Sequence, residues 1–293
     1  MIKYEELPRT HSIEQHSRTR PRSNAFEMAM RRASGFLPAA ITVFALIFLF
    51  APLVVLAVYS FNDSISTVVW RGFSVRWYAK LFTNRALLGS VQVSVIVSLV
   101  SAFISTALGT LTALAVVRFK FLGRETLGTL LIAPLVIPEI VLGVALLVLV
   151  VVTRIPLGYV TLVMGHVVVT VPFAILIVRA AVAAFDTRLE EAAQDLGANG
   201  LQTFTRVTLP ILLPSIGAAF SLTATLSFDN FVCSVFLSGV GTTPLPVRIY
   251  SMLKLGITPE INAMGVLLIC FNVLVLGLIV GRQVRSAMTK GST

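Results

Sequence analysis

Residues 181–210 read AVAAFDTRLEEAAQDLGANGLQTFTRVTLP, and this stretch separates two long apolar segments of the chain. Its middle, residues 189–196, contains no glycine, proline or β-branched residue and carries acidic residues in its first turn, which favours a helix. Gly197 follows directly and suits the left-handed conformation that ends many helices. Asn199-Gly200 is typical of a turn. The stretch therefore predicts a helix–turn–helix hairpin, whose second short helix covers residues 201–207.

The predicted hairpin has one small apolar face. Four apolar residues recur at i, i+3, i+4 and i+7 and so lie on one side of its first helix. They are Leu189, Ala192, Ala193 and Leu196. This face is too small to form a core of its own. Two interpretations remain open from these residues: the face packs on helix ends of the same chain, or it enters a groove on a partner protein.

Long uncharged segments flank the hairpin and recur along the chain. The 293 residues are 56% hydrophobic and only 12% charged, whereas soluble domains carry roughly 25% charged residues. A helix needs about 20 apolar residues to cross a bilayer. Four segments without any charge reach that length, and two more are interrupted by a single acid. We therefore predict an all-α, polytopic membrane protein with six transmembrane helices, at about residues 39–60, 87–117, 127–152, 158–180, 210–233 and 262–281.

Lysine and arginine are distributed unevenly between the segments that join these helices. If the N-terminus lies inside, the inner segments hold 16 of them and the outer segments 7. Because positive residues concentrate on the cytoplasmic side, both termini are predicted to be cytoplasmic, and the net charge of +10 is interpreted as a topology signal rather than as nucleic-acid binding. Residues 1–35 are polar and arginine-rich, which indicates a disordered tail. Residues 286–293 form a second, short tail.

The sequence contains no motif for ATP hydrolysis or covalent catalysis. It has no G-x-x-x-x-G-K-[ST] loop, no H-E-x-x-H helix and no G-x-S-x-G turn. Cys233 and Cys270 lie in apolar surroundings and form no disulfide framework or zinc-ligand pattern. His166, the one histidine inside a predicted helix, is interpreted as hydrogen-bonded to a neighbouring helix. We therefore expect a protein that is not an enzyme, without a metal site or cofactor.

The hairpin resembles the EAA loop of permease subunits in binding-protein-dependent ABC importers. The pattern of that loop is E-A-A-x₃-G-x₉-I-x-L-P, and the chain matches it at Glu191-Ala192-Ala193, Gly197 and Leu209-Pro210, with Val207 in place of isoleucine. The resemblance covers about residues 36–285 and implies the type I importer permease (MetI-like) fold. It also implies that the loop at residues 181–209 couples the membrane helices to a cytoplasmic ATPase.

The same resemblance implies a set of partners and a location. The partners are a second homologous permease chain, two cytoplasmic ABC ATPase subunits, an extracytoplasmic solute-binding protein and the lipid bilayer. The location is the inner (plasma) membrane of a bacterial cell. Proline at the start of the fifth predicted helix, Pro210, fits this organisation because proline is well tolerated in the first turn of a helix.

Two acids interrupt otherwise apolar segments. A charged carboxylate at the bilayer centre costs about 2.5–3.5 kcal/mol on insertion scales, so Glu139 and Asp229 are expected to face the protein interior or an aqueous path. No basic residue lies inside a predicted helix to neutralise them, which favours a cationic cargo. Two structural roles stay open: Glu139 satisfies backbone donors freed by Pro134 and Pro138, or Asp229 caps a helix break.

Further segments are similar to the spermidine/putrescine branch of this family, in particular to the second of its two permease chains. They are Tyr59-Ser60-Phe61-Asn62, Trp77-Tyr78, and residues 226–232, 245–251 and 259–263. The resemblance implies a polyamine cargo, with Glu139, Asp229 and Asn230 on its path. Asn230 stands where that branch commonly has a second acid. The alternatives are other branches of the family, which carry ferric iron, thiamine, opines or phosphonates, and an ion-coupled secondary transporter.

The outer segment at residues 238–261 is rich in glycine, proline and threonine and lacks a strong helical or strand pattern. Long connections without secondary structure are uncommon and invite a functional explanation. Two interpretations remain: a docking site for the solute-binding protein, or a solvated connector.

Overall fold

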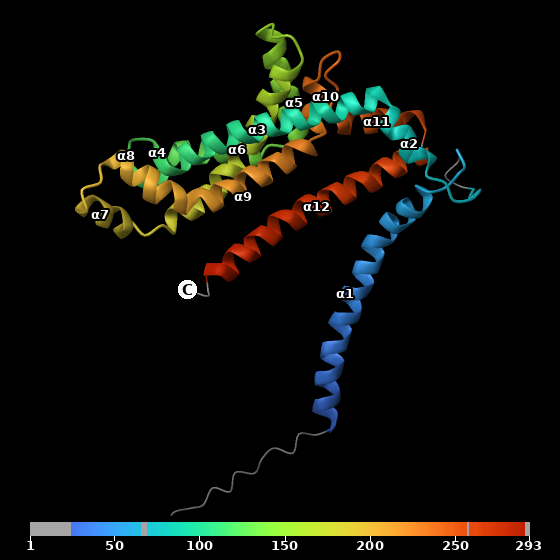
Figure 1. The fold of residues 1–293 in the computed structure, drawn as a ribbon, viewed down its shortest axis with the longest axis horizontal. Helices are drawn as coiled ribbons and strands as arrows, with labels where there is room; N and C mark the ends of the chain where they lie inside the picture. The colour runs from blue at the N-terminus through green and yellow to red at the C-terminus, as the bar shows by residue number, and fades with distance from the viewer. Residues whose placement is uncertain (1–24, 66–68, 257, 291–293) are drawn as a thin grey trace, which may run out of the picture. The chain divides into compact units, whose positions relative to one another are not determined.

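The computed structural model describes residues 25–65, 69–256 and 258–290 of the chain. The described part is built from helices (Figure 1), and its only β-type pairing is one isolated bridge between Asn62 and Phe73. The chain divides into two units, residues 1–55 and 56–293. The all-α prediction is therefore confirmed for the described residues.

The first unit holds most of α1 (Ala25–Tyr59). Its part from Pro38 to Tyr59 is long and apolar enough to cross a membrane, as predicted. The helix begins earlier than expected: residues 25–35, which the sequence predicts to be part of a disordered tail, lie within α1. The remainder of that predicted tail, residues 1–24, lies outside the described residues.

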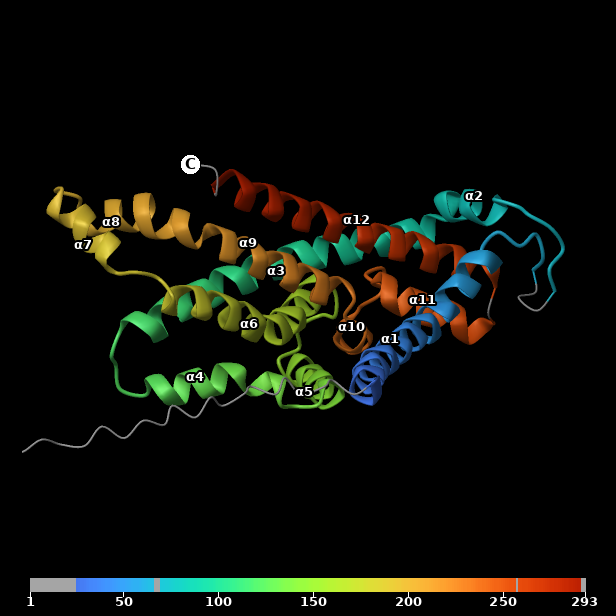
Figure 2. The same cartoon turned by 90° about the horizontal axis from the view of Figure 1, so that it is seen from below.

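Three long helices form the centre of the second unit: α3 (Arg85–Arg118), α6 (Tyr159–Ala183) and α9 (Leu209–Phe228) (Figures 1 and 2). Small residues let them approach closely. A Cβ atom added at Gly109 of α3 would lie 2.6 Å from the Cβ of Ala174 in α6. Hydroxyl groups bond across the same helices, as between Ser105 and Thr170 at 2.7 Å. Close packing of small residues with polar contacts is typical of helices that associate within a membrane.

The third predicted transmembrane helix, residues 127–152, is not continuous. It consists of α4 (Arg124–Ile132), a 3₁₀ turn η1 (Ala133–Leu135) and α5 (Glu139–Val152), and the two parts meet at an angle of 104°. The physical reason is the pair Pro134 and Pro138, since each proline lacks a backbone donor and its ring collides with the preceding turn. The prolines were expected to disturb this segment, but its prediction as one helix over residues 127–152 was wrong at this break.

The fifth predicted helix also ends early. α9 stops at Phe228, and a separate helix α10 (Val232–Leu237) follows a short break. By length and composition, four helices of the described chain can cross a membrane, or five if the bent pair counts as one. The last helix, α12 (Pro259–Lys290), has 32 residues and includes the sixth predicted span at residues 262–281. It includes most of the predicted C-terminal tail, and the count of six spans stays a prediction.

The outer segment at residues 238–261 is not a plain connector, because its middle forms α11 (Leu245–Leu255). Leu245 is buried, and its backbone N–H donates to Ser94 Oγ of α3 at 2.8 Å. Arg248 Nε donates to Ser90 Oγ of the same helix at 3.3 Å. Tertiary contacts therefore determine a helix that local sequence did not reveal.

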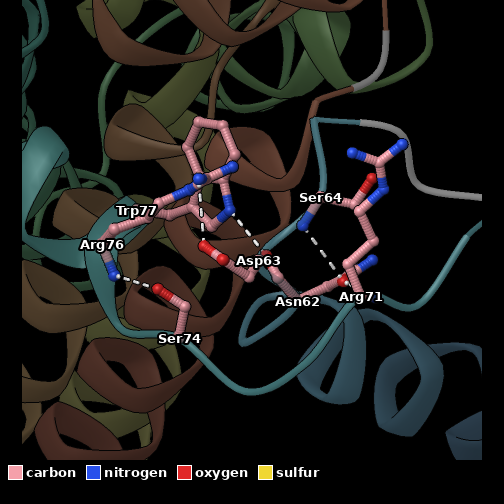
Figure 3. Close-up of polar contacts among 7 residues, drawn as sticks. All are labelled: Asn62, Asp63, Ser64, Arg71, Ser74, Arg76 and Trp77. Carbon is pink, nitrogen blue, oxygen red and sulfur yellow. Dashed lines mark hydrogen bonds and ion pairs between the residues drawn. The ribbon is translucent and has the colours of Figure 1, made fainter.

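The loop between α1 and α2 (Arg76–Thr83) is organised around the buried Asn62 (Figure 3). Asn62 Oδ1 accepts bonds from the backbone N–H groups of Ser64 and Arg71, at 3.2 and 3.0 Å. Its backbone carbonyl accepts a bond from Trp77 Nε1 at 2.8 Å, while Asp63 and Arg76 form an ion pair at 3.0 Å. The loop is thus held by several polar contacts of its own.

Candidate functional site

The hairpin predicted from sequence is present. α7 (Arg188–Asp195) and α8 (Gly200–Thr203) flank its turn, and a π-helical turn η2 (Phe204–Thr208) leads from α8 into α9. Gly197 has a φ of +89°, which confirms the left-handed end of the first helix. A capping box begins α8: the Gln202 N–H donates to Asn199 Oδ1 at 2.9 Å, and the Asn199 N–H donates to Gln202 Oε1 at 3.0 Å.

One charged contact anchors the hairpin to the membrane helices. Glu190 accepts a hydrogen bond from Arg118, the last residue of α3, at 2.8 Å and a second bond from the Thr208 hydroxyl. The guanidinium of Arg118 also lies 5.3 Å from the ring centre of Phe185. Sequence reasoning missed this anchor, because it concentrated on Glu191. The available signal was an arginine at the end of one apolar segment and an acid beside the motif.

The apolar face of the hairpin is open. Leu189, Leu196 and Leu201 are 47%, 90% and 73% exposed, and Glu191 and Ala192 are exposed beside them. Ala193 and Leu209 are half-buried, and Pro210 is exposed in the first turn of α9. Packing on the chain's own helix ends is therefore not what the structure shows for the three leucines.

The two breaks in the helices bring distant polar residues together. Glu139 begins α5, and Asn230 lies between α9 and α10, 91 positions later. Asn230 Nδ2 donates to Glu139 Oε1 at 2.6 Å, and Asn230 Oδ1 accepts from the backbone N–H of Cys233 at 2.9 Å. Asn230 thus bonds the start of α10, while Asp229 is the C-cap residue of α9. The capping role considered for the Asp229 side chain stays a prediction. Glu139 accepts from a side chain, not from the backbone donors considered for it.

Asp229 is exposed and borders a hollow of about 290 Å³. Aromatic rings lie in its wall, and the Phe231 and Tyr250 ring centres are 4.9 Å apart. The Lys254 ammonium lies 4.8 Å from the centre of the Tyr250 ring. An aromatic face of this kind attracts an alkylammonium ion, and a carboxylate beside it adds a second attraction. The hollow thus combines one carboxylate with aromatic rings, one of which already contacts the Lys254 ammonium.

His166 has a structural environment. Its Nδ1 lies 2.7 Å from Ser227 Oγ, and its Nε2 lies 3.1 Å from Ser234 Oγ. The ring thus joins α6 to α9 and α10, and the predicted hydrogen bonding to neighbouring helices is confirmed. Within the described residues, no group of three or more histidine, cysteine, aspartate or glutamate side chains is arranged to hold a metal ion.

Residues 105–286, more than half of the chain, match the family described as the binding-protein-dependent transport system inner membrane component. The chain belongs to this family. It is therefore a membrane-embedded component of a transport system, and the family is not one of enzymes.

Curated relatives extend this likeness over most of the chain. The spermidine/putrescine transport system permease protein PotC of Escherichia coli (strain K12) is 35% identical over 84% of the chain and 92% of the relative. PotC of Haemophilus influenzae is 37% identical over 80% and 91%, respectively. The putrescine transport system permease protein PotI of Escherichia coli (strain K12) is 36% identical over 76% and 82%.

Solved structures of the same fold confirm the predicted MetI-like permease architecture. A bacterial ABC transporter involved in alginate import matches 89% of this chain and 96% of its own, with a TM-score of 0.68 and 17% identity. The MetNI methionine ABC transporter in an inward-facing form matches 71% of this chain and 97% of its own, with a TM-score of 0.55 and 20% identity. At these identities, the likeness concerns the fold of the permease.

Proposed function

We propose that this permease forms half of the membrane pathway of a polyamine ABC importer, with both termini in the cytoplasm. Its partners are a second permease chain, two cytoplasmic ATPase subunits and an extracytoplasmic solute-binding protein. The arginine and lysine distribution supports this orientation. The observation that carries the proposal is the hairpin: an exposed apolar knob at residues 188–208, fixed to α3 by Glu190.

The hairpin is built to transmit displacement. The motif position Glu191 lies within the short helix α7, and Gly197 follows the end of that helix. Glu190 of the same helix bonds Arg118 and Thr208. When the ATPase subunits close on ATP, they press Leu189 and Leu196 inside their cleft. Because η2 continues directly into α9, this movement reaches the membrane helices as a rigid-body shift.

The cargo assignment rests on charge and on the named relatives. PotC and PotI are permeases of spermidine/putrescine and putrescine transport systems. In this chain, Asp229 borders an aromatic hollow, and Glu139 and Asn230 meet where two helices break. A polyamine carries primary ammonium groups, and the carboxylate and rings of this region attract such groups. Asp229 therefore contacts the cargo as it passes, and the Glu139–Asn230 contact holds the neighbouring helix ends.

Uptake in living cells tests this function. Labelled putrescine and spermidine are offered to cells that lack the chain, to cells with it restored, and to cells with the Asp229→Asn variant. We expect restored uptake, reduced about tenfold by Asp229→Asn because one ionic contact to the cargo contributes roughly 1.5 kcal/mol. Asp63→Asn, which removes a carboxylate from an exposed ion pair elsewhere, is the matched control and should leave uptake nearly unchanged.

The outcomes separate the alternatives. Uptake that survives Asp229→Asn would remove this residue from the cargo path. If the restored chain supports no polyamine uptake with its partners present, the cargo belongs to another branch, such as ferric iron, thiamine, opine or phosphonate transport. Uptake that withstands ATP depletion but stops with an uncoupler would indicate a secondary transporter and contradict the proposal.

A further inference from the structure

A hollow of about 720 Å³ lies at the hairpin end of the second unit, where α3 gives way to α4. Its walls come from the end of α3, the following turn, the start of α4 and one residue of α6. It contains neither the exposed leucines of the hairpin nor the acids of the cargo region. The coupling and cargo roles therefore leave it without a function.

Positive charge gathers in this hollow. Lys120, Arg124 and Arg179 line it, against one acid, Glu125. In the part of the chain that the structure describes, none of the three cations takes part in an ion pair. The amino end of α4 opens into the same space. The Arg124 N–H bonds the Phe121 carbonyl at 3.3 Å, and the N-cap Gly123 has no side chain to bond the N–H groups that follow. Backbone donors at a helix start and unpaired cations together favour a phosphate group.

Apolar side chains line the same hollow. Phe121 and Leu122 follow the end of α3 and are exposed, and Ile132 of α4 also lies in the wall. A soluble anion needs no such apolar rim, and neither does an acidic peptide. A phospholipid needs both features, because its phosphate meets cations while its acyl chains lie on apolar side chains. The hollow therefore matches a lipid at the membrane surface better than a free anion.

We propose that this hollow binds the headgroup of an anionic phospholipid of the cytoplasmic leaflet, through Lys120, Arg124 and Arg179. The inference rests on the proposed function for its orientation, since the hairpin end must face the cytoplasm. The bound headgroup neutralises the cations at the junction of α3 and α4. It also holds α4, the short first half of the broken helix, at the membrane surface.

The test measures lipid retention by the purified complex in detergent, by native mass spectrometry with added phosphatidylglycerol or phosphatidylcholine. The variant is Arg124→Gln/Arg179→Gln. Its matched control is Arg71→Gln/Arg154→Gln, which removes the same charge at two exposed positions outside both the hollow and the hairpin. Arg124→Lys/Arg179→Lys keeps the charge and checks that side-chain replacement alone is tolerated.

We expect selective retention of phosphatidylglycerol. The Gln variant should lose about thirtyfold in apparent affinity, since each basic residue near a membrane surface contributes roughly fivefold. The control and the Lys variant should bind as the parent does. Equal retention of both lipids, or equal loss in the control, would overturn the proposal. Displacement of phosphatidylglycerol by millimolar inorganic phosphate would also overturn it, because the site would then take a soluble anion. Lipid retention is measured without any transport. If the polyamine assignment fails in the uptake assay, selective retention of phosphatidylglycerol can therefore still be observed.

Discussion

The two ends of the second unit are held in different ways. At the end with α2 and α11, buried polar residues join loop to helix: Asn62 organises the loop before α2, and Glu260 of α12 bonds Lys80 at 2.7 Å and Asn84 at 3.3 Å. At the hairpin end, Glu190 joins the hairpin to α3 through Arg118 and bonds Thr208, which directly precedes α9. The side chains of Leu189, Leu196 and Leu201 are exposed there. Figure 1 shows α7 and α8 at one end and α2 and α11 at the other.

The difference indicates which end is complete by itself. A segment stabilised by its own buried hydrogen bonds needs no partner to keep its shape. A hairpin with an exposed apolar face has surface that remains to be covered, and large exposed apolar side chains that cluster mark interaction sites. We therefore propose that the hairpin end is the end at which this permease engages its ATPase, and we expect substitutions at the two ends to fail in different assays.

The largest expected effect comes from a charge placed on the open face. Leu196 and Leu255 are 90% and 91% exposed, the first on the hairpin and the second at the end of α11. Leu196→Asp should weaken co-purification of the ATPase about thirtyfold or more, because a central contact in an interface contributes roughly 2 kcal/mol or more. Leu255→Asp is the matched control. If both variants co-purify equally with the ATPase, the hairpin end is not distinguished from the α11 end as the ATPase-binding surface.

The opposite end is tested by Asn62→Ala. This change removes the side-chain partners of the Ser64 and Arg71 backbone donors and of the Val69 carbonyl. Val69 and Arg71 are exposed, so water replaces part of what is lost, and the free energy of unfolding should fall by about 1–2 kcal/mol. The unfolding midpoint in detergent should therefore fall while ATPase co-purification persists. Asn272→Ala, at an exposed site, is the control. An unchanged midpoint would show that the loop contacts do not hold this end.

Most of this contrast was not accessible from the sequence. The apolar segments predicted the long helices. The composition of residues 189–196 predicted α7 and its glycine end, and their spacing predicted an apolar face whose exposure stayed open. Local pattern could not reveal that Arg118 would meet Glu190 or that Glu139 would meet Asn230, because these contacts join residues 72 and 91 positions apart. The break after Phe228 contains no proline, and its Asn230 bonds Glu139 and Cys233 instead. The helix α11 likewise depends on contacts with α3.

Gly197→Val probes the shape of the hairpin. A Cβ atom at Gly197 would meet no atom within 4 Å, so collision is not the obstacle. The obstacle is the backbone φ of +89° at Gly197, because holding an L-residue in this left-handed conformation costs about 1–2 kcal/mol. ATP-driven uptake should fall severalfold with chain expression retained. Gly200→Val is the control, because Gly200 also has open space but lies in a helix; an equal loss there would remove the special role of the turn.

The smallest effect is expected from Glu260→Gln. The variant loses the ion pair to Lys80 but keeps an oxygen that can accept from Asn84. Because Lys80 is largely exposed, the loss in unfolding free energy should be about 1 kcal/mol or less. Thermal unfolding in detergent measures it, with Asp63→Asn in the more exposed pair as a comparison expected to change less. A larger loss from Asp63→Asn would reverse the order assigned to these two pairs.

Site-specific photo-cross-linking tests the central claim most directly. A photoreactive amino acid replaces Leu196 in one version of the chain and Leu255 in another, and each is irradiated in membranes that contain the complete transporter. The account predicts a cross-linked product with the ATPase subunit from position 196 and none from position 255. Absence of that product at 196, or its equal formation at both positions, would contradict the assignment of the hairpin as the ATPase-coupling element.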